Sequence, residues 1–198
     1  MYVGFILRTL PIALEYIDSM PSVDINDHDQ FKCVLALDEI VDPQNLGALL
    51  RSALFLGCDK VVVCTKNSAP LSPTVCKASA GALEFVDISA TKNMMKFLDK
   101  SKVNGWQVVG TALTDNSINI KDLKVEKPTI LVLGNEGSGI RTNILVRCDT
   151  LVKISGTNSQ ANEGNSNGNG NGNGNPVDSL NVSVSGAILL HHILNISK

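Results

Sequence analysis

Three segments of the chain combine polar or glycine residues with the start of an apolar pattern, and each could carry chemistry. The first has the sequence DPQNLG at residues 42–47 and continues in a helical pattern to Arg51. Asn45 and Arg51 are six residues apart, so their side chains could converge on one cleft. An arginine placed there could bind a phosphate or stabilise a developing alkoxide. A plain helix N-cap at Asn45 with a solvated Arg51 fits this segment equally well.

The second segment is a glycine loop, GNEGSG at residues 134–139, which follows an apolar strand. Such a loop is expected to expose successive backbone N–H groups and to let a ligand approach the chain closely. It matches neither G-x-x-x-x-G-K-[ST] nor a complete G-x-G-x-x-G pattern, so a P-loop for nucleoside triphosphates is disfavoured. The alternative for Glu136 is that it only complements the positive end of the next helix.

The third segment, SLNVSVS at residues 179–185, opens a strongly apolar helical pattern. The purely structural explanation for its polar start is that Ser179 caps the helix. The apolar residues between Val182 and Leu194 could pack one broad face of this helix, either inside the domain or against a second copy of the chain.

Alternating strands and helices must position these segments. Strands are predicted at residues 31–37, 60–64, 85–88, 105–112, 129–133 and 150–154, and helices at 46–56, 72–80, 91–102, 141–146 and 179–196. This alternation predicts an α/β fold, with a parallel sheet covered by helices on both faces. Ligands in such sheets sit beyond the carboxyl ends of the strands, where the first two segments begin.

The chain divides into an N-terminal part and one domain. Residues 1–30 are predicted to form an amphipathic helix and a polar linker, and residues 31–198 a single domain. The Asn/Gly tract at residues 156–175 can bury almost nothing, so it is predicted to be a disordered insertion within that domain.

Composition narrows the class of protein. The 198 residues are 43% hydrophobic and 18% charged, which suits a globular domain, and no apolar run approaches the roughly 20 residues of a membrane span. The start of the chain reads poorly as a secretory signal. Five cysteines without a C-x-x-C pair argue against a disulfide framework and a metal site. A net charge of −2 gives no global basic field for nucleic acid, so contacts with RNA would be local or come from elsewhere.

Together the three segments resemble, in order and spacing, the motifs D-P-x-N-x-G-x-x-x-R, L-G-x-E-G-x-G and S-L-N-V-S-V of the SpoU (TrmH) branch of the SPOUT superfamily of RNA methyltransferases. The resemblance runs from about Phe31 to the C-terminus. It implies methyl transfer from S-adenosylmethionine to a ribose 2′-hydroxyl of RNA, a deep C-terminal trefoil knot and a homodimer. It implies neither a metal nor a membrane.

The resemblance also implies roles for residues, with Arg51 helping to deprotonate or orient the 2′-hydroxyl. Four further residues would shape the catalytic site: Asn45, Glu136, Ser179 and Asn181. Eight would bind the cofactor: Thr111, Ala112, Leu113, Leu133, Gly134, Gly139, Ile154 and Leu180. One departure from the family pattern is that Ile154 is followed by Ser155-Gly156 in place of I-P-M-x-G, and the missing proline is expected to loosen this loop.

Several alternatives remain open for the substrate. The style of the motifs and the Asn/Gly tract favour a guanosine of mitochondrial large-subunit rRNA in a fungus or a similar eukaryote, and therefore a mitochondrial location ahead of a cytoplasmic one. A tRNA substrate, or a non-catalytic RNA-binding protein that keeps the fold, are the alternatives. A Rossmann oxidoreductase is disfavoured, because no glycine fingerprint follows the first predicted strand.

Overall fold

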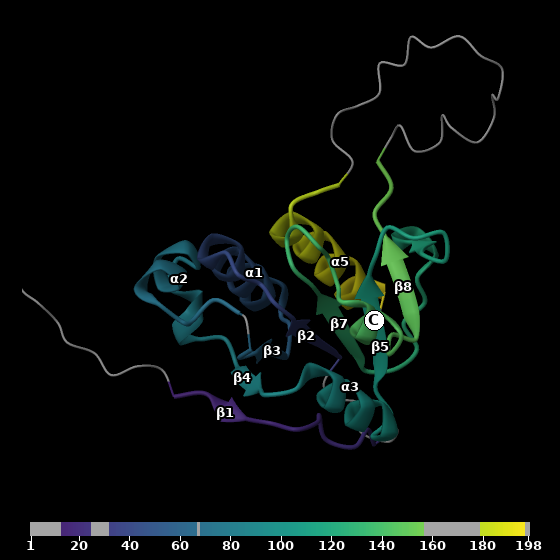
Figure 1. The fold of residues 1–198 in the computed structure, drawn as a ribbon, viewed down its shortest axis with the longest axis horizontal. Helices are drawn as coiled ribbons and strands as arrows, with labels where there is room; N and C mark the ends of the chain where they lie inside the picture. The colour runs from purple at the N-terminus through teal and green to yellow at the C-terminus, as the bar shows by residue number, and fades with distance from the viewer. Residues whose placement is uncertain (1–12, 25–31, 67, 157–178, 197–198) are drawn as a thin grey trace, which may run out of the picture.

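The computed structural model describes residues 13–24, 32–66, 68–156 and 179–196 (Figure 1). Residues 1–12 of the predicted N-terminal helix and linker region, and nearly all of the Asn/Gly tract, lie outside these ranges. Within them, no helix is long and apolar enough to cross a membrane, and no group of His, Cys, Asp or Glu side chains could hold a metal ion.

The sheet has eight strands in the order β1-β4-β3-β2-β7-β5-β8-β6, and every pair of neighbours is parallel. The strands are β1 Glu15–Tyr16, β2 Cys33–Leu37, β3 Lys60–Cys64, β4 Ile88–Thr91, β5 Gln107–Thr111, β6 Ile118–Asn119, β7 Thr129–Leu133 and β8 Thr150–Lys153. The predicted parallel α/β fold is therefore confirmed.

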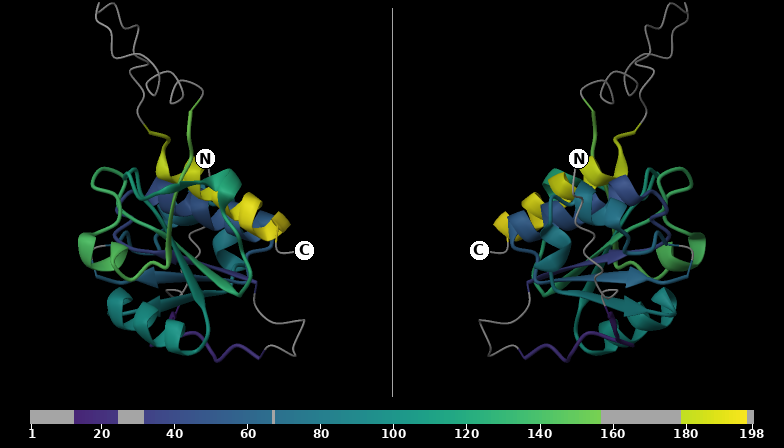
Figure 2. Two further views of the ribbon diagram at one scale, coloured as in Figure 1. Left: turned by 90° about the vertical axis from the view of Figure 1, so that its right-hand side faces the viewer. Right: turned by 90° about the vertical axis from the view of Figure 1, so that its left-hand side faces the viewer.

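Helices cover both faces of this sheet (Figure 2). The helices are α1 Pro43–Leu56, α2 Pro73–Ala78, α3 Met94–Val103, α4 Thr142–Leu145 and α5 Val182–Ile196, with short 3-10 turns η1 Ala82–Glu84 and η2 Ile120–Asp122. One core cluster joins the sheet to α1, α2 and α5, and a second joins it to α3 and α4. The central strands serve both clusters, because alternate residues face opposite sides: in β2, Leu35 packs in the first cluster and Val34 in the second.

Helix α1 has a well-defined start, end and packing face. Asp42 caps it by accepting a hydrogen bond from the Gln44 backbone N–H at 3.0 Å, and Gly57 ends it in the left-handed conformation with φ 80°. At Gly47 the helix lies so close to α2 that an added Cβ would be 2.5 Å from the Cβ of Ala78. The motif glycine at position 47 is therefore a packing requirement.

Several element boundaries differ from the predicted ones by one to three residues, and two of the differences have a clear local cause. The third predicted strand, at residues 85–88, is wrong: β4 begins at Ile88, and Phe85 is 79% exposed in the turn that follows η1. Helix α3 begins at Met94 because the Asn93 side chain caps it, accepting from the Lys96 N–H at 3.1 Å. Strand β6 was not predicted, because two residues carry no periodic signal.

The described part of the N-terminal region packs on the domain. Strand β1 pairs with β4 at the edge of the sheet, and Met20 is only 1% exposed. The Met20 backbone N–H donates to Ser101 Oγ at 2.9 Å, and Trp106 Nε1 donates to the Pro21 carbonyl at 2.8 Å. Residues 13–24 contain no helix. We therefore expect the folded unit to begin before the predicted boundary at residue 31.

Met20→Ala tests this expectation. Removing a fully buried methionine side chain should lower the free energy of unfolding by about 2–5 kcal/mol, measured by urea denaturation. Glu15→Ala, at an exposed position of the same segment, should change it by less than about 0.5 kcal/mol. Equal small effects of both substitutions would mean that the segment is a linker after all.

Candidate active site

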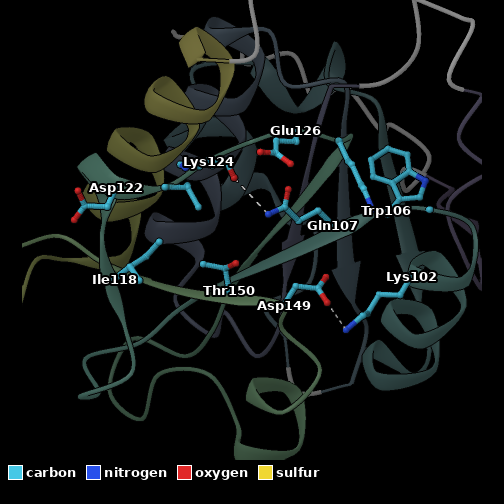
Figure 3. A pocket seen from close by; sticks show the side chains of 12 residues that line it. Lys102, Trp106, Gln107, Ile118, Asp122, Lys124, Glu126, Asp149 and Thr150 are labelled. Carbon is cyan, nitrogen blue, oxygen red and sulfur yellow. Dashed lines mark hydrogen bonds and ion pairs between the residues drawn. The ribbon is translucent and has the colours of Figure 1, made fainter.

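The structure has two large cavities, one at the amino ends of the strands and one at their carboxyl ends, which we call the amino and carboxyl edges of the sheet. The larger, of about 550 Å³, lies at the amino ends of β5, β7 and β8 (Figure 3). Polar groups there already pair with one another: Lys102 Nζ lies 2.6 Å from Asp149 Oδ1, and Gln107 Nε2 donates to the Lys124 carbonyl. The second, of about 380 Å³, lies at the carboxyl ends of the same strands, where parallel sheets bind ligands. We take this carboxyl-edge cavity as the candidate site.

All eight residues that were predicted to bind the cofactor line the carboxyl-edge cavity, as do Glu136 and Ser179. They come from the ends of β5, β7 and β8 and from the segment before α5. In Figure 1 the start of α5 lies beside the carboxyl end of β8, although the two are far apart in sequence. The fold thus gathers segments that the sequence separates.

The glycine loop is folded onto itself by Asn135. The Asn135 backbone exchanges two hydrogen bonds with that of Gly139, and Asn135 Oδ1 accepts from the N–H groups of Gly137 and Ser138 at 2.9 and 3.0 Å. A Cβ at Gly134 would overlap with the backbone of Gly139. The N–H groups of Gly137, Ser138 and Gly139 are therefore not free for a ligand as predicted, since the Asn135 side chain and backbone accept them. The glycine at position 134 instead lets two backbone segments of the loop approach each other closely.

Glu136 binds the loop that follows β2. Its carboxylate accepts from the backbone N–H groups of Asp42 at 3.1 Å and Val41 at 3.5 Å, and from Asn45 Nδ2 at 3.3 Å. The alternative that Glu136 only complements the next helix is therefore wrong. Its acceptor oxygens hold the start of α1 against the glycine loop.

Asn181 connects the third segment to the same group. Asn181 Nδ2 donates to Asn45 Oδ1 at 3.0 Å, while Asn181 Oδ1 accepts from the Ser183 N–H at 2.8 Å and so caps α5. The capping residue is therefore Asn181, and Ser179 is exposed at the cavity. Asn45, Glu136 and Asn181 form one hydrogen-bonded chain across all three segments.

Arg51 does not join this group. It is exposed on α1 and does not line the carboxyl-edge cavity, whereas Asn45 is buried against Glu136. Six residues advance a helix by about 9 Å and turn it away from the starting face. The predicted convergence of the two side chains on one cleft is therefore not found within a single chain.

The loop after β8 has Ser155 where the family pattern has a proline, and a hydrogen bond fixes this residue. Asn119 Nδ2, at the end of β6, donates to Ser155 Oγ at 2.8 Å. Ile154 still lines the cavity. The predicted loosening of this loop is thus opposed by a hydrogen bond that the sequence did not reveal.

The sequence model of the SpoU rRNA Methylase family matches residues 32–161. This chain belongs to the SpoU rRNA methylase family.

Curated proteins with similar sequences support this family assignment. The mitochondrial rRNA methyltransferase 1 of Schizosaccharomyces pombe is 44% identical over 80% of this chain and 50% of its own length, and the human protein of that name is 40% identical over 83% and 46%. The Dictyostelium discoideum protein is 36% identical over 97% of this chain and 38% of its own length. This SpoU domain therefore spans half or less of the length of these curated relatives.

Solved structures share the fold. An AdoMet-bound rRNA methyltransferase from Sinorhizobium meliloti is 25% identical, with a TM-score of 0.69 over 85% of this chain and 58% of that one. A TrmH/SpoU tRNA modifying enzyme from A. aeolicus, 24% identical, gives a TM-score of 0.69 over 84% and 76%. Because the A. aeolicus enzyme is only 24% identical, its similarity to this chain shows a shared fold and nothing more.

An ion pair that sequence reasoning missed holds the SpoU glycine loop from its far end. Arg141 donates through Nε and Nη2 to the two carboxylate oxygens of Asp38, at 2.9 and 2.7 Å, and Asp38 is only 1% exposed. This bidentate bond to Asp38 raises the pKa of Arg141 above its ordinary value. Neither residue carries a sequence signal for the other, because 103 positions separate them.

Sequence reasoning also missed part of the cavity wall. Thr114, Lys153, Val182, Ser185 and Leu189 line it together with the predicted residues. The three on α5 follow helical spacing, a signal that could have identified them once Leu180 was placed at the site.

Three cysteines of this SpoU domain have a raised pKa, and none of these three offers a thiolate nucleophile. Burial raises the pKa of the Cys148 thiol to about 12 and also raises that of Cys64. A hydrogen bond with Cys58, together with burial, raises the pKa of Cys33 well above its usual range. These three thiols stay protonated at neutral pH.

Arg141→Met should lower the free energy of unfolding by about 2–3 kcal/mol in urea denaturation, because it leaves the buried Asp38 carboxylate without its cation. Adding Asp38→Asn should recover a large part of the loss. Arg147→Met, which breaks the more exposed pair with Asp99, should cost less than about 1 kcal/mol. Similar costs for the two arginine variants would contradict a special role for Arg141.

Proposed function

We propose that this chain transfers a methyl group from S-adenosylmethionine to a ribose 2′-hydroxyl of RNA. The observation that carries the proposal is that the second and third motif segments line one cavity, while Asn45 of the first segment is hydrogen-bonded to Glu136 and to Asn181 beside it. Relatives at 36–44% identity named rRNA methyltransferase and an AdoMet-bound structural neighbour support it.

The carboxyl-edge cavity fits the proposed cofactor. Its volume of about 380 Å³ falls within the usual range for small-molecule sites, and its wall mixes apolar side chains with a few polar groups. We assign the adenine part to apolar residues such as Leu113, Ile154 and Leu180, and the close backbone contacts to Gly134 and Gly139. The cofactor, when bound, supplies an electrophilic methyl group.

The residues of the chain would act mainly by positioning. The reacting hydroxyl oxygen must lose its proton as it takes the methyl group, so a group that orients it or stabilises negative charge speeds the reaction. Glu136 already accepts hydrogen bonds from four N–H donors, so we assign it to fixing the start of α1 and not to removing the proton. Arg51 is the candidate for orienting the hydroxyl, stabilising the alkoxide or binding phosphate, with Ser179 and Asn181 shaping the site.

We further propose that the chain is knotted at this cavity and forms a homodimer. What supports the knot is the family likeness, together with the return of α5 to the end of β8. What supports the dimer is an exposed apolar set on α1 and α5: Leu54, Phe55, Val184 and Ile188, with exposed fractions of 39%, 87%, 47% and 39%.

The proposed substrate is a guanosine of mitochondrial large-subunit rRNA, and the proposed location is the mitochondrion. The support is that the relatives at 36–44% identity are named mitochondrial rRNA methyltransferase 1. A net charge of −2 gives no global basic field, so we expect its contacts with RNA to be local or to be supplied by a partner subunit.

Ser185→Leu tests the location of cofactor binding by filling the cavity from α5 with a good helix former. It should weaken S-adenosylmethionine binding at least tenfold in calorimetric titration, while Thr74→Leu on the exposed surface of α2 should leave it unchanged. Gly134→Val is a poorer test, because its side chain would also disrupt the loop. Equal affinities of both variants and the wild type would place cofactor binding elsewhere.

Arg51→Ala should lower methyl transfer at least about 100-fold and change S-adenosylmethionine affinity less than twofold, because Arg51 does not line the cavity. Transfer of labelled methyl to rRNA and tRNA transcripts, followed by nucleoside mass spectrometry, measures this, with Arg147→Ala as the control at another arginine that does not line the cavity. Label on a base, or cofactor binding without any transfer to RNA, would contradict the proposed reaction. The second result would favour a non-catalytic RNA-binding role.

A further inference from the structure

The carboxyl-edge cavity has an uneven distribution of charge. Among the described residues that line it, only Glu136 and Lys153 ionise readily. The Glu136 carboxylate is occupied by the N–H groups of Val41 and Asp42 and by Asn45. Lys153 is therefore the one charge in the described wall that is left for a ligand.

Lys153 is the last residue of β8, and it is half-buried. In the described part of the chain its ammonium group has neither an ion pair nor a hydrogen bond. Two other lysines that are partly withdrawn from water differ in this respect: Lys60 lies 2.6 Å from Asp87, and Lys102 lies 2.6 Å from Asp149. Withdrawing a cation from water costs free energy unless an anion compensates it, so an unpaired lysine in a cavity wall points to an anionic ligand group.

We propose that Lys153 binds the carboxylate of the cofactor's methionine part, an inference that rests on the proposed function. That carboxylate is the only anionic group of S-adenosylmethionine, whose amino and sulfonium groups are cationic. Thr111 on the neighbouring strand β5 and Ile154, next in the chain, line the same wall. A cation at this place therefore faces the cofactor pocket and can reach the one anionic group of the ligand.

The proposal predicts a specific coupling between Lys153 and one ligand group. Decarboxylated S-adenosylhomocysteine, which ends in an aminopropyl chain, lacks only the carboxylate. Wild-type protein should bind S-adenosylhomocysteine about tenfold more tightly than this analogue, the lower end of what a charge-assisted hydrogen bond contributes, because Lys153 is partly exposed. In Lys153→Met the difference between the two ligands should fall below about twofold.

Calorimetric titration of the full chain with both ligands measures this coupling. Lys153→Arg keeps the charge and should preserve most of the discrimination. Lys127→Met, an exposed lysine at the opposite, amino edge of the sheet, should behave as wild type. Circular dichroism and urea denaturation of each variant establish that it is folded.

Three results would overturn the proposal. Lys153→Met could bind S-adenosylhomocysteine as tightly as wild type, or it could lose the same factor for both ligands, which would indicate a packing role. It could also leave both affinities unchanged and weaken only RNA binding, which would assign Lys153 to a phosphate. Failure of the wild-type protein to bind S-adenosylhomocysteine at all would instead refute the proposed function, so the two failures are distinguishable.

Discussion

The carboxylate of Glu136 stands at the centre of the candidate site because it accepts hydrogen bonds from the chain just after β2. Through the Asp42 N–H and Asn45 Nδ2 it fixes the start of α1 to the glycine loop, and through Asn45 it reaches Asn181 at the start of α5. These hydrogen bonds join the three segments to one another through their side chains. Two of them line the cavity and the first is fixed beside it, which is the alignment that a positioned reaction requires.

Close packing and one ion pair keep that arrangement in place. Gly186 brings α5 so near α1 and β7 that a Cβ would meet the side chains of Leu49 and Leu133, and Gly134 lets the loop close on itself. Asp38 and Arg141 clamp the far end of the loop to the end of β2. The glycines and the clamp set the positions, and the hydrogen bonds of Glu136 then connect them.

Most of the fold and much of the site could be predicted from the sequence, and the physical reasons can be named. Buried strands and capped helices leave periodic patterns, and the motif residues of all three segments met as the order of the strands requires. Contacts between residues far apart in the sequence could not be predicted. They include the pairing of Asp38 with Arg141 and the pairing of residues 15–16 with β4, and the lack of a described partner for Lys153 could not be predicted either. Arg51 shows an error of another kind, because six residues along a helix do not return a side chain to the starting face, so the spacing itself did not support its convergence with Asn45.

The central claim is that the second and third motif segments, with the ends of β5 and β8, form the cofactor site at the carboxyl edge of the sheet, and that the first segment is hydrogen-bonded to both. The most direct measurement is a titration of ¹⁵N-labelled protein with S-adenosylhomocysteine, followed by amide chemical shifts. The account predicts that the largest shifts fall at residues 111–114, 134–139 and 180–185, with little change at residues 122–127 around the opposite cavity. Shifts concentrated at residues 122–127, or saturable binding without shifts in the glycine loop, would contradict it.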